Sequence, residues 1–464
     1  MKYDVVVLGG GIGGCAAACA AARNGAKTLL IEESGVLGGQ AGLGIVTPYS
    51  AWKSRSGANF GGICEEIALG IESLGEKFCT VGAEKESVSP FSASPVVRMH
   101  LLKMVTDSGA EIRFHSTFAD AVVENGRIVS VRCLGRNGFF TVEGENFIDA
   151  TGDGALIARS GAEWVLGSEP GVFEALTESG MDQSHYSESK YDEYKENGKM
   201  QPVSLFFVMG NVDVENVHKL NNKELKFGDL GITREKFRAW EYAGTCGFEE
   251  NGDRIPMPQG RVLITHGVRP DQAVVNMSRV IDINGADADS LNEGEIKAQL
   301  QLVALVDFLQ KFVPGFENSY LIQCASTLGI RETRRLVGRT VLRGRDVIQC
   351  KHFPDAIARG SYMVDIHDPN GKARAIGGDL QGDYYEIPYG CLVANEPVNL
   401  LACGRCISAD HVAHSSTRIQ GTCAMTGEAA GTAAAMSAAR KILPAELPVE
   451  ELQAQLKRAG VNLD

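Results

Sequence analysis

The chain has 464 residues, of which 44% are hydrophobic and 22% charged, a composition typical of a globular protein with two or three domains. A formal net charge of −13 repels phosphate backbones and anionic lipid headgroups, so nucleic acid and membrane surfaces are not expected partners. The 12 cysteines are scattered, many of them in apolar runs, and the first residues lead into an apolar segment without a targeting pattern. We therefore expect reduced thiols in a cytoplasmic protein.

The start of the chain predicts a βαβ unit that holds a dinucleotide. Residues 4–8 form a β-branched apolar run typical of a buried parallel strand, and residues 9–14 match G-x-G-x-x-G. The alanine-rich residues 15–23 favour a helix, and a second apolar run at residues 28–31 ends in Glu32. Because strand, glycines, helix, strand and acid follow in this order, a merely structural turn is the weaker interpretation.

Each part of this unit has a physical task. Gly9 permits the tight turn, Gly11 lets a pyrophosphate approach the backbone, and Gly14 lets the helix pack close to the strand. The helix N-terminus offers free N–H groups to the phosphates. Glu32 can accept hydrogen bonds from the ribose hydroxyls of an adenosine, so we expect the unit to bind the adenosine half of the ligand.

The next region predicts a small antiparallel sheet. Residues 95–106 favour a helix, and alternation predicts strands at residues 111–114, 121–123 and 128–133. Asn125-Gly126 is typical of a tight hairpin turn, so we expect these strands to form a β-meander.

The pattern changes after a strand predicted at residues 146–150, which is followed by Thr151-Gly152-Asp153-Gly154. Residues 169–201 are polar and predict a surface excursion. Strands are expected at residues 202–209 and 261–266, and a long helix at residues 292–312. Near the end of the chain, a strand at residues 399–402 leads into Cys403-Gly404-Arg405, and the small residues 422–439 predict a helix.

Five stretches resemble the FAD-dependent oxidoreductase family, bacterial flavoproteins with a glutathione-reductase-type FAD domain. They are the N-terminal glycine motif; Leu328-Gly-Ile-Arg-Glu-Thr-Arg-Arg-Leu-Val-Gly338; Tyr385-Glu-Ile-Pro-Tyr-Gly-Cys-Leu-Val393; Gly404-Arg-Cys-Ile-Ser-Ala-Asp410 with Arg418 and Thr422-Cys-Ala-Met-Thr-Gly-Glu-Ala-Ala-Gly431; and Glu451-Leu-Gln-Ala-Gln-Leu-Lys-Arg-Ala-Gly460.

The resemblance implies an α/β fold, with a Rossmann-like FAD-binding domain of the GR2 type, a β-meander and an inserted α+β substrate domain. It implies that residues 1–154 form the first part of the FAD-binding domain, residues 155–339 the substrate domain, and residues 340–464 the second part with C-terminal helices.

The resemblance also implies which residues hold FAD. Gly38 and Gly39 would line the pyrophosphate, Thr151 to Asp153 would pass the adenosine, and Gly404 and Arg405 would lie beside the ribityl chain. The helix that starts near Thr422 would point its N-terminus at the flavin pyrimidine ring and stabilise the negative charge of a reduced flavin. The full predicted set is Gly9, Gly11, Gly13, Gly14, Glu32, Glu33, Gly38, Gly39, Gln40, Ala119, Thr151, Gly152, Asp153, Gly404, Arg405, Thr422 and Cys423.

The sequence departs from the wider superfamily at one of these positions. Many relatives carry an acid where Arg405 stands, and Asp410 is the candidate for that role here. A second dinucleotide motif is also missing, since Ile157 occupies the third glycine's place after Gly152-Asp-Gly154. We therefore expect no dedicated NAD(P)H domain, and electrons would pass through a substrate, a quinone, oxygen or a partner protein.

Three arginines, Arg331, Arg334 and Arg335, would share one face if their stretch were helical. Arg331 or Arg335 could then anchor an anionic group of the substrate by a bidentate contact. The alternative is that these arginines pair with some of the 58 acidic residues.

His411, His414 and Arg418 follow the strand expected to pass the flavin. In fumarate-reductase-like relatives a histidine and an arginine in the comparable segment hold a substrate carboxylate, so these three residues are candidate catalytic groups by analogy. A histidine there could transfer a proton as hydride moves. The alternative is a structural histidine.

For two further groups of residues, a structural role is more strongly favoured than a catalytic one. Tyr385 and Tyr389 could bring a phenol to the active site, although core packing is the default for an aromatic in such a run. Cys403 and Cys406 form C-x-x-C and could exchange electrons with a reduced flavin, but small apolar residues also suit the end of a buried strand. Zinc spacings, a nucleophile elbow and a P-loop are absent, so no metal site is expected.

These features predict an FAD-dependent oxidoreductase that transfers hydride between a small, possibly anionic, organic substrate and the N5 atom of non-covalently bound FAD. The alternative is a flavin electron-carrier subunit of a larger redox complex. A third possibility, an RNA-modifying flavoprotein, is disfavoured by the acidic balance. A homo-oligomer or a redox partner protein is compatible with either of the first two.

Overall fold

The computed structural model describes residues 2–46, 48–78, 94–169, 198–221, 223–240, 253–255, 257–369 and 376–464. The surface excursion predicted at residues 169–201 falls largely outside these ranges. Among the described residues, no helix combines the length and the apolar character that crossing a bilayer requires.

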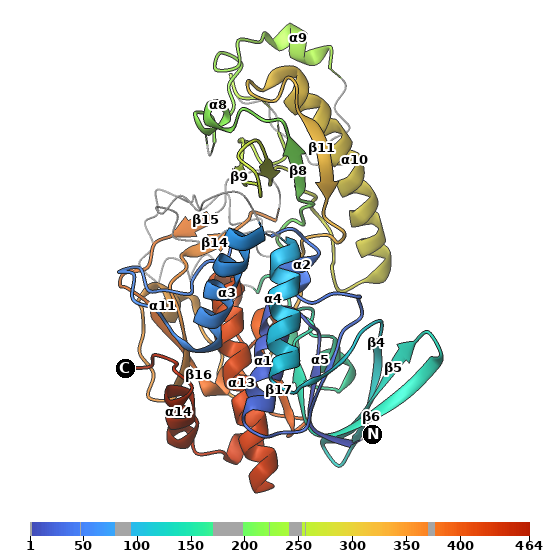
Figure 1. Ribbon diagram of the computed structural model, residues 1–464, viewed down its shortest axis with the longest axis vertical. Helices are drawn as coiled ribbons and strands as arrows, with labels where there is room; N and C mark the ends of the chain where they lie inside the picture. The colour runs from blue at the N-terminus through green and yellow to red at the C-terminus, as the bar shows by residue number, and fades with distance from the viewer. Residues whose placement is uncertain are drawn as a thin grey trace.

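A five-stranded parallel sheet lies at the centre of the larger part of the molecule (Figure 1). Its strand order is β3 (Glu111–Arg113), β2 (Thr28–Ile31), β1 (Lys2–Leu8), the second half of β6 (Gly138–Asp149) and β17 (Leu400–Ala402). Strands β1, β2 and β17 are apolar and mostly buried, as expected for parallel strands covered on both faces, whereas the edge strand β3 is partly exposed. The strands predicted at the start, middle and end of the chain therefore form one sheet.

Two helices of small residues pack against this sheet and against each other. They are α1 (Ile12–Arg23) and α13 (Gln420–Arg440), which lie side by side in Figure 1. A Cβ atom on Gly427 would lie 2.1 Å from the Gly13 carbonyl oxygen, and one on Gly431 would lie 2.1 Å from that of Ala17. Glycine is thus required for the close approach of the two helices. The flanking helices are α3 (Gly62–Phe78) and α4 (Ser94–Asp107), the latter confirming the helix predicted at residues 95–106.

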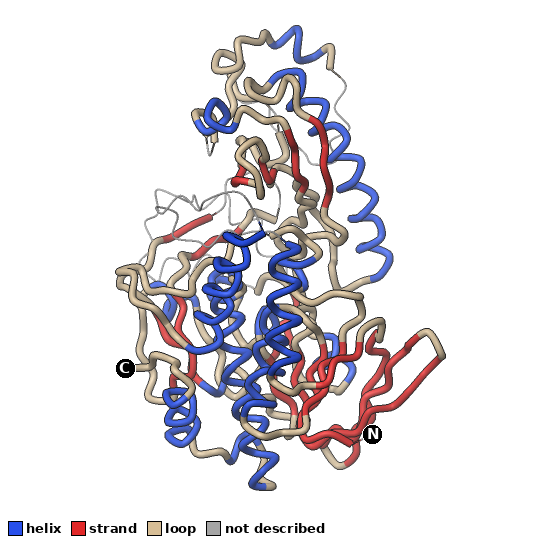
Figure 2. Tube along the Cα trace, in the orientation of Figure 1, coloured by secondary structure: helices blue, strands red, loops and turns tan. Residues whose placement is uncertain are grey.

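The long strand β6 joins the parallel strands to an antiparallel meander within one seven-stranded sheet. Its first half pairs antiparallel with β5 (Arg127–Gly135), which pairs with β4 (Thr117–Glu124), and this meander extends to one side of the molecule (Figure 2). The hairpin turn predicted at Asn125-Gly126 is confirmed. The assignment of residues 111–114 to the meander is wrong, because β3 follows the crossover helix α4 and pairs in parallel with β2.

A second, antiparallel sheet stands above the first and has its own apolar core. Its order is β11 (Tyr320–Cys324), β8 (Phe207–Gly210), β10 (Ala273–Val275) and β9 (Ile264–His266). The long helix predicted at residues 292–312 is confirmed as α10 (Ala288–Phe312), which begins earlier because the Asp287 side chain accepts a hydrogen bond from the Ser290 amide. The strands predicted at residues 202–209 and 261–266 are shorter than expected, and Val203 and Ser204 form only isolated bridges. The domain boundaries at residues 154 and 339 stay a prediction.

Short paired strands connect the two parts. β7 (Trp164–Leu166) pairs with β12 (Arg334–Leu336), so the helical conformation considered for the arginine stretch is wrong. Pairing with β7 overrides the helix propensity of this run, and alternation then separates Arg334 from Arg335. The remaining elements are α2 (Gly39–Gly42), α5 (Ala155–Arg159), α8 (Val214–His218), α9 (Arg234–Arg238), α11 (Gly344–Ile348), β13 (Ala356–Gly360), β14 (Val364–Ile366), β15 (Ile376–Gly378), β16 (Tyr385–Pro388), α12 (His411–Thr417) and α14 (Val449–Arg458), with short 3-10 helices at Tyr389–Cys391, Gly404–Cys406 and Pro444–Glu446.

Candidate active site

The glycine turn leaves open space at one position. Gly9 has φ +99°, and a Cβ on Gly14 would lie 1.8 Å from the Gly9 carbonyl oxygen, so these two glycines are required by the turn and by helix packing. A Cβ on Gly11 would meet no described atom within 4 Å. Gly11 precedes α1, whose N-terminus has no side-chain cap. The space beside Gly11 therefore faces free helical N–H groups, as an anion site requires.

The other predicted glycines bring further elements to this turn. A Cβ on Gly13 would lie 3.1 Å from the Cys423 carbonyl oxygen, so Gly13 allows α13 to approach. Gly38 and Gly39 have φ +109° and +49°, and the Gly38 amide donates to the Gly10 carbonyl at 2.8 Å. The loop before α2 thus folds back over the turn.

At the predicted adenosine end, Glu32 already has protein partners. Its Oε2 accepts from the Gly10 amide and its Oε1 from the Ser34 amide, each at 2.7 Å. Glu33 beside it is exposed. Ala119 lies where the β4–β5 register shifts, between the paired residues Phe118 and Asp120, so it is outside the regular ladder. The ribose role of Glu32 stays a prediction, and the observed carboxylate holds the turn in place.

Three distant segments meet around Arg405. Arg405 Nη2 lies 2.6 Å from Asp153 Oδ1, which also accepts from Thr333 Oγ1 at 2.9 Å. Gly152 has φ +77°, and a Cβ there would lie 2.9 Å from Arg405 Nη2. Thr151 donates to Asp149 Oδ1 through both its amide, at 3.0 Å, and its hydroxyl, at 2.7 Å. The structure thus brings the predicted residues 151–153 and Arg405 together.

Asp410, the candidate acid for the ribityl chain, has a different task. Its Oδ1 accepts from the Ala413 amide at 2.8 Å and caps α12, and its Oδ2 accepts from the Gly344 amide at 2.9 Å. Both oxygens are therefore engaged by the protein.

The N-terminus of α13 is surrounded by unsatisfied polar atoms. It has no side-chain cap, and Thr422 and Cys423 lie buried in its first turn. Gln40 donates from Nε2 to the Leu328 carbonyl at 3.0 Å, and Gln420 donates to the Val46 carbonyl at 2.8 Å. The Oε1 atoms of both glutamines are buried and have no hydrogen-bond partner in the described part of the chain. Buried acceptors without partners are costly, so a ligand with N–H donors would satisfy this place.

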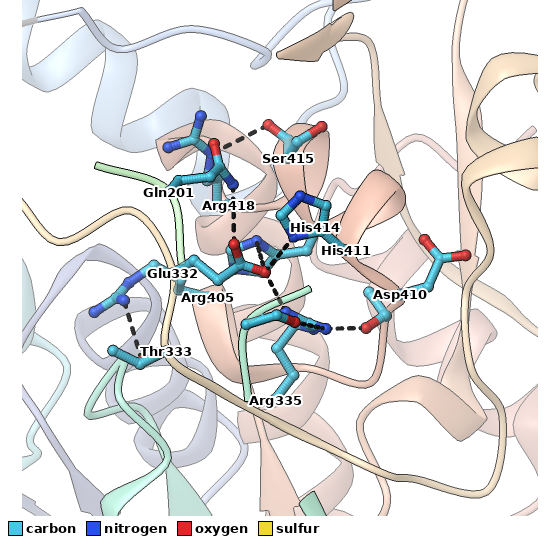
Figure 3. Close-up of polar contacts among 12 residues, drawn as sticks. Gln201, Glu332, Thr333, Arg335, Arg405, Asp410, His411, His414, Ser415 and Arg418 are labelled. Carbon is cyan, nitrogen blue, oxygen red and sulfur yellow. Dashed lines mark hydrogen bonds and ion pairs between the residues drawn. The ribbon is translucent and has the colours of Figure 1, made fainter. Parts of the chain in front are cut away.

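Behind this region, Glu332 organises a buried network (Figure 3). Its Oε1 accepts from His411 Nδ1 at 2.7 Å and from Arg335 Nη1, and Gln201 Nε2 lies 3.4 Å from its Oε2. Burial raises the pKa of Glu332, but His411 and Arg335 outweigh this effect and hold it well below its usual range.

Arg335 is fully buried, and all three nitrogens of its guanidinium have hydrogen-bond partners. It pairs with Glu332 and Glu169, and it donates to the carbonyls of Ala409 at 2.8 Å and Gly167 at 2.9 Å. This geometry supports the alternative interpretation, pairing with acids, and Arg335 ties β12 to the loop before α12. The predicted shared arginine face is wrong, because Arg334 turns away toward the Trp164 ring at 5.4 Å.

Both candidate histidines are fully buried. His411 pairs with Glu332, and burial lowers the pKa of His414 well below its usual range. Neither ring nitrogen of His414 has a hydrogen-bond partner among the residues described. Neither imidazole has accessible surface in this structure, and the catalytic role of the two histidines stays a prediction.

Sequence reasoning named Arg418 and Arg331 but missed the other members of a second polar cluster, Asp365, His367 and Arg279. Arg418 Nη2 donates to the Asp365 carbonyl at 2.9 Å and lies 3.5 Å from Asp365 Oδ2, which is 3.4 Å from His367 Nε2. His367 Nδ1 lies 3.1 Å from Arg279 Nη2. The positive charge of Arg331 lowers the pKa of both Asp365 and His367. The i, i+2 spacing of Asp365, in the strand Val364–Ile366, and His367, just after it, was the available signal.

The remaining candidates are in the core. Tyr385 and Tyr389 are buried, and their hydroxyls bind Ser416 Oγ at 2.8 Å and the Pro444 carbonyl at 2.9 Å. Cys403 and Cys406 are buried thiols, and burial raises the pKa of each well above its usual range. A reactive cysteine needs the opposite shift, so this geometry favours packing for the C-x-x-C pair.

A parallel sheet with a glycine turn at β1 and a late helix aimed at the same region defines a dinucleotide-binding redox fold. Comparison with protein families matches residues 4–456 to the FAD dependent oxidoreductase family. The chain belongs to this family; it is an enzyme, and its cofactor is FAD. The open space at Gly11 and the unpaired acceptors of Gln40 and Gln420 fit that cofactor.

Two curated relatives match part of the chain. Digeranylgeranylglycerophospholipid reductase 2 of Methanothermobacter thermautotrophicus is 30% identical over 176 residues, and reductase 1 of Methanopyrus kandleri is 31% identical over 173 residues. Each match covers 34% of this chain and 42% of the relative's length.

Solved structures are similar at lower identity. A geranylgeranyl bacteriochlorophyll reductase-like protein of Thermoplasma acidophilum matches with a TM-score of 0.42 and 14% identity, covering 99% of this chain and 84% of that one. The flavin-dependent brominase Bmp2 matches with a TM-score of 0.45 and 10% identity, covering 99% and 83%.

Proposed function

We propose that this enzyme transfers hydride between a small organic substrate and non-covalently bound FAD. The observation that carries the proposal is the polar interior at the start of α13, where Gln40 and Gln420 keep unpaired buried acceptors. Arg418 lies just before the same helix, so charged groups for a substrate adjoin the place that fits the flavin. A carrier that only relays electrons to another protein needs the acceptors that fit the flavin, but it does not need charged groups for a substrate beside them.

We further propose that FAD is held in the arrangement of the GR2-type domain, with residues 155–339 acting as the substrate domain. The pyrophosphate would lie in the space beside Gly11, where the N-terminus of α1 offers free N–H groups. The ribityl chain would pass Gly404 and Arg405, and the pair of Arg405 with Asp153 would fix that guanidinium.

FAD supplies the two-electron chemistry when bound. The protein's own residues supply orientation and charge. The N-terminus of α13 places a partial positive charge at the site, which favours anionic groups there. The buried Glu332–His411 and Glu332–Arg335 pairs hold α12 and β12 in register and exclude water from behind the site. His414 stays neutral because burial disfavours its charged form.

Anaerobic titration of the purified holoenzyme tests the proposal. Heat denaturation should release the FAD, which shows that it is not covalently attached. A panel of small organic compounds should contain one that bleaches the flavin absorbance anaerobically without a protein partner, or one that reoxidises the reduced enzyme. If only a partner protein exchanges electrons with the flavin, the enzyme is a carrier and the proposal is wrong.

A further inference from the structure

Three guanidinium groups and one carboxylate gather beside the start of α13. They belong to Arg279, Arg331, Arg418 and Asp365, which come from four separate parts of the chain, and His367 lies among them. We propose that Arg331 and Arg418 bind a carboxylate of the substrate, so that this enzyme acts on an organic acid. The inference rests on the proposed function and names the substrate class for the same site.

The first step is the environment of Arg331. Its Nη1 donates to the Pro202 carbonyl and to Ser204 Oγ at 2.9 Å, and no ion pair of this guanidinium occurs within the described ranges. Burial lowers its pKa to about 9, and the neighbouring charges of Arg418 and Arg279 lower it further, while Asp365 opposes them. The group remains charged at neutral pH, and among the described residues no carboxylate lies within ion-pair distance of it, Asp365 acting only from farther away. A buried charge is retained in proteins when it is paired, and an anionic ligand would pair it.

The second step is the tautomer of His367. A guanidinium can only donate hydrogen bonds, so His367 Nδ1 accepts from Arg279 Nη2 at 3.1 Å. The ring proton therefore lies on Nε2, which faces Asp365 Oδ2 at 3.4 Å. Burial lowers the pKa of His367 to about 3, with Arg331 acting in the same direction, so the ring is neutral. The neutral ring positions the Asp365 carboxylate and leaves the net charge of the cluster unchanged.

The third step is the balance of charge. Arg331, Arg418 and Arg279 each carry a positive charge, and the Asp365 carboxylate opposes the effect of the other two arginines on the pKa of Arg331. Arg418 shares Asp365 with His367, so its guanidinium is incompletely neutralised. Asp365 would repel a dianion more strongly than a monoanion, and a planar guanidinium matches a carboxylate in a bidentate pair. The cluster therefore favours a carboxylate over a phosphate.

The fourth step is the position of the cluster. Arg418 precedes α13, which starts at Gln420. The Leu328 carbonyl accepts a hydrogen bond from Gln40 Nε2 of α2 at 3.0 Å, and Gly329 forms a β-bridge with Ser204. These contacts tie the segment that carries Arg331 to the cofactor side. Both arginines thus extend from elements that adjoin the predicted flavin position, where a bound acid would be held next to the redox group.

The test uses the FAD-loaded enzyme with acetate, benzoate, succinate and inorganic phosphate as probes. The readouts are the flavin absorbance spectrum and the thermal midpoint, with FAD content measured separately. At least one carboxylate should perturb the spectrum and raise the midpoint saturably. Arg331→Gln and Arg418→Gln should each weaken that binding at least about tenfold, as loss of a charge-assisted pair requires. The exposed Arg339→Gln, which removes the same charge nearby, should bind the carboxylate as the unmodified enzyme does.

A second measurement separates binding from structural roles. If Arg331 is kept for a ligand, Arg331→Gln should retain FAD and leave the ligand-free thermal midpoint unchanged or higher, because an uncompensated charge is removed. The inference is overturned if no carboxylate binds, if Arg331→Gln binds carboxylate normally, or if phosphate binds more tightly than every carboxylate. An enzyme that contains FAD but ignores carboxylates would overturn only this inference. An enzyme without FAD whose midpoint still rises with carboxylate would instead overturn the proposed function.

Discussion

Replacing Gly11 with alanine should weaken FAD binding and leave the fold intact. Gly11 has φ −68°, which any residue adopts, and its added Cβ would meet no described atom within 4 Å. Losing glycine at a helix N-cap costs about 1 kcal/mol or less, and the lower entropy of the unfolded chain returns roughly 0.4–1 kcal/mol. The stability of the apoprotein should therefore change by less than about 1 kcal/mol. A methyl forced against a bound pyrophosphate costs about 1–3 kcal/mol, so the Kd for FAD should rise about 5- to 150-fold.

The matched control is Gly14→Ala in the same motif. Its Cβ would lie 1.8 Å from the Gly9 carbonyl oxygen, so α1 must move away from β1. We expect a loss of about 3 kcal/mol or more in the free energy of unfolding, with or without cofactor. Urea unfolding of the apoproteins and fluorescence titration with FAD give the two quantities. Normal FAD affinity in folded Gly11→Ala would refute the assignment of this space to the pyrophosphate.

Three further predictions concern buried groups. Arg335→Gln removes one of the two ion-pair partners of the buried Glu332 carboxylate and should lower the free energy of unfolding by about 3–5 kcal/mol in urea denaturation. Burial raises the pKa of Glu428 to about 8 from 4.5, so unfolding releases its proton and stability should fall between about pH 4.5 and about pH 8, by up to about 1.4 kcal/mol per pH unit. Glu428→Gln should flatten that part of the pH profile. Because Cys403 and Cys406 are buried, reductive titration should deliver only the electron pair that FAD takes up, and Cys403→Ala should not change it.

Each of these has its own check. The exposed Arg339→Gln should change stability by less than about 0.5 kcal/mol, and an equal loss there would mean that charge alone explains the Arg335 effect. Gln at position 428 can still accept from the Ile63 amide, which Glu428 does at 2.8 Å, so an unchanged pH slope would show that another group titrates. A second electron pair that disappears in Cys403→Ala would establish a redox-active dithiol.

The behaviour of the arginine stretch shows where local reasoning ends. The run around Arg331 has good helix formers, and i, i+3 and i+4 spacing would have placed three guanidiniums on one face. Pairing of β12 with β7 gives Arg335 and Arg334 different surroundings instead, while Arg331 lies outside the strand. The partner strand is about 170 residues away in sequence, so no window on the arginines contains the deciding contact.

The sequence by itself determined the dinucleotide unit, because its strand, glycine turn, helix and acid are contiguous, and Gly9, Gly13 and Gly14 each meet a steric need within the unit or at α13. The meander turn and the long helix α10 follow from equally local patterns. Only the tertiary structure decided which charged side chains form ion pairs. It buries Arg335 and both histidines around Glu332, and it leaves Arg331 without an ion pair in the part of the chain that the structure describes. Segments that are distant in the sequence make both environments.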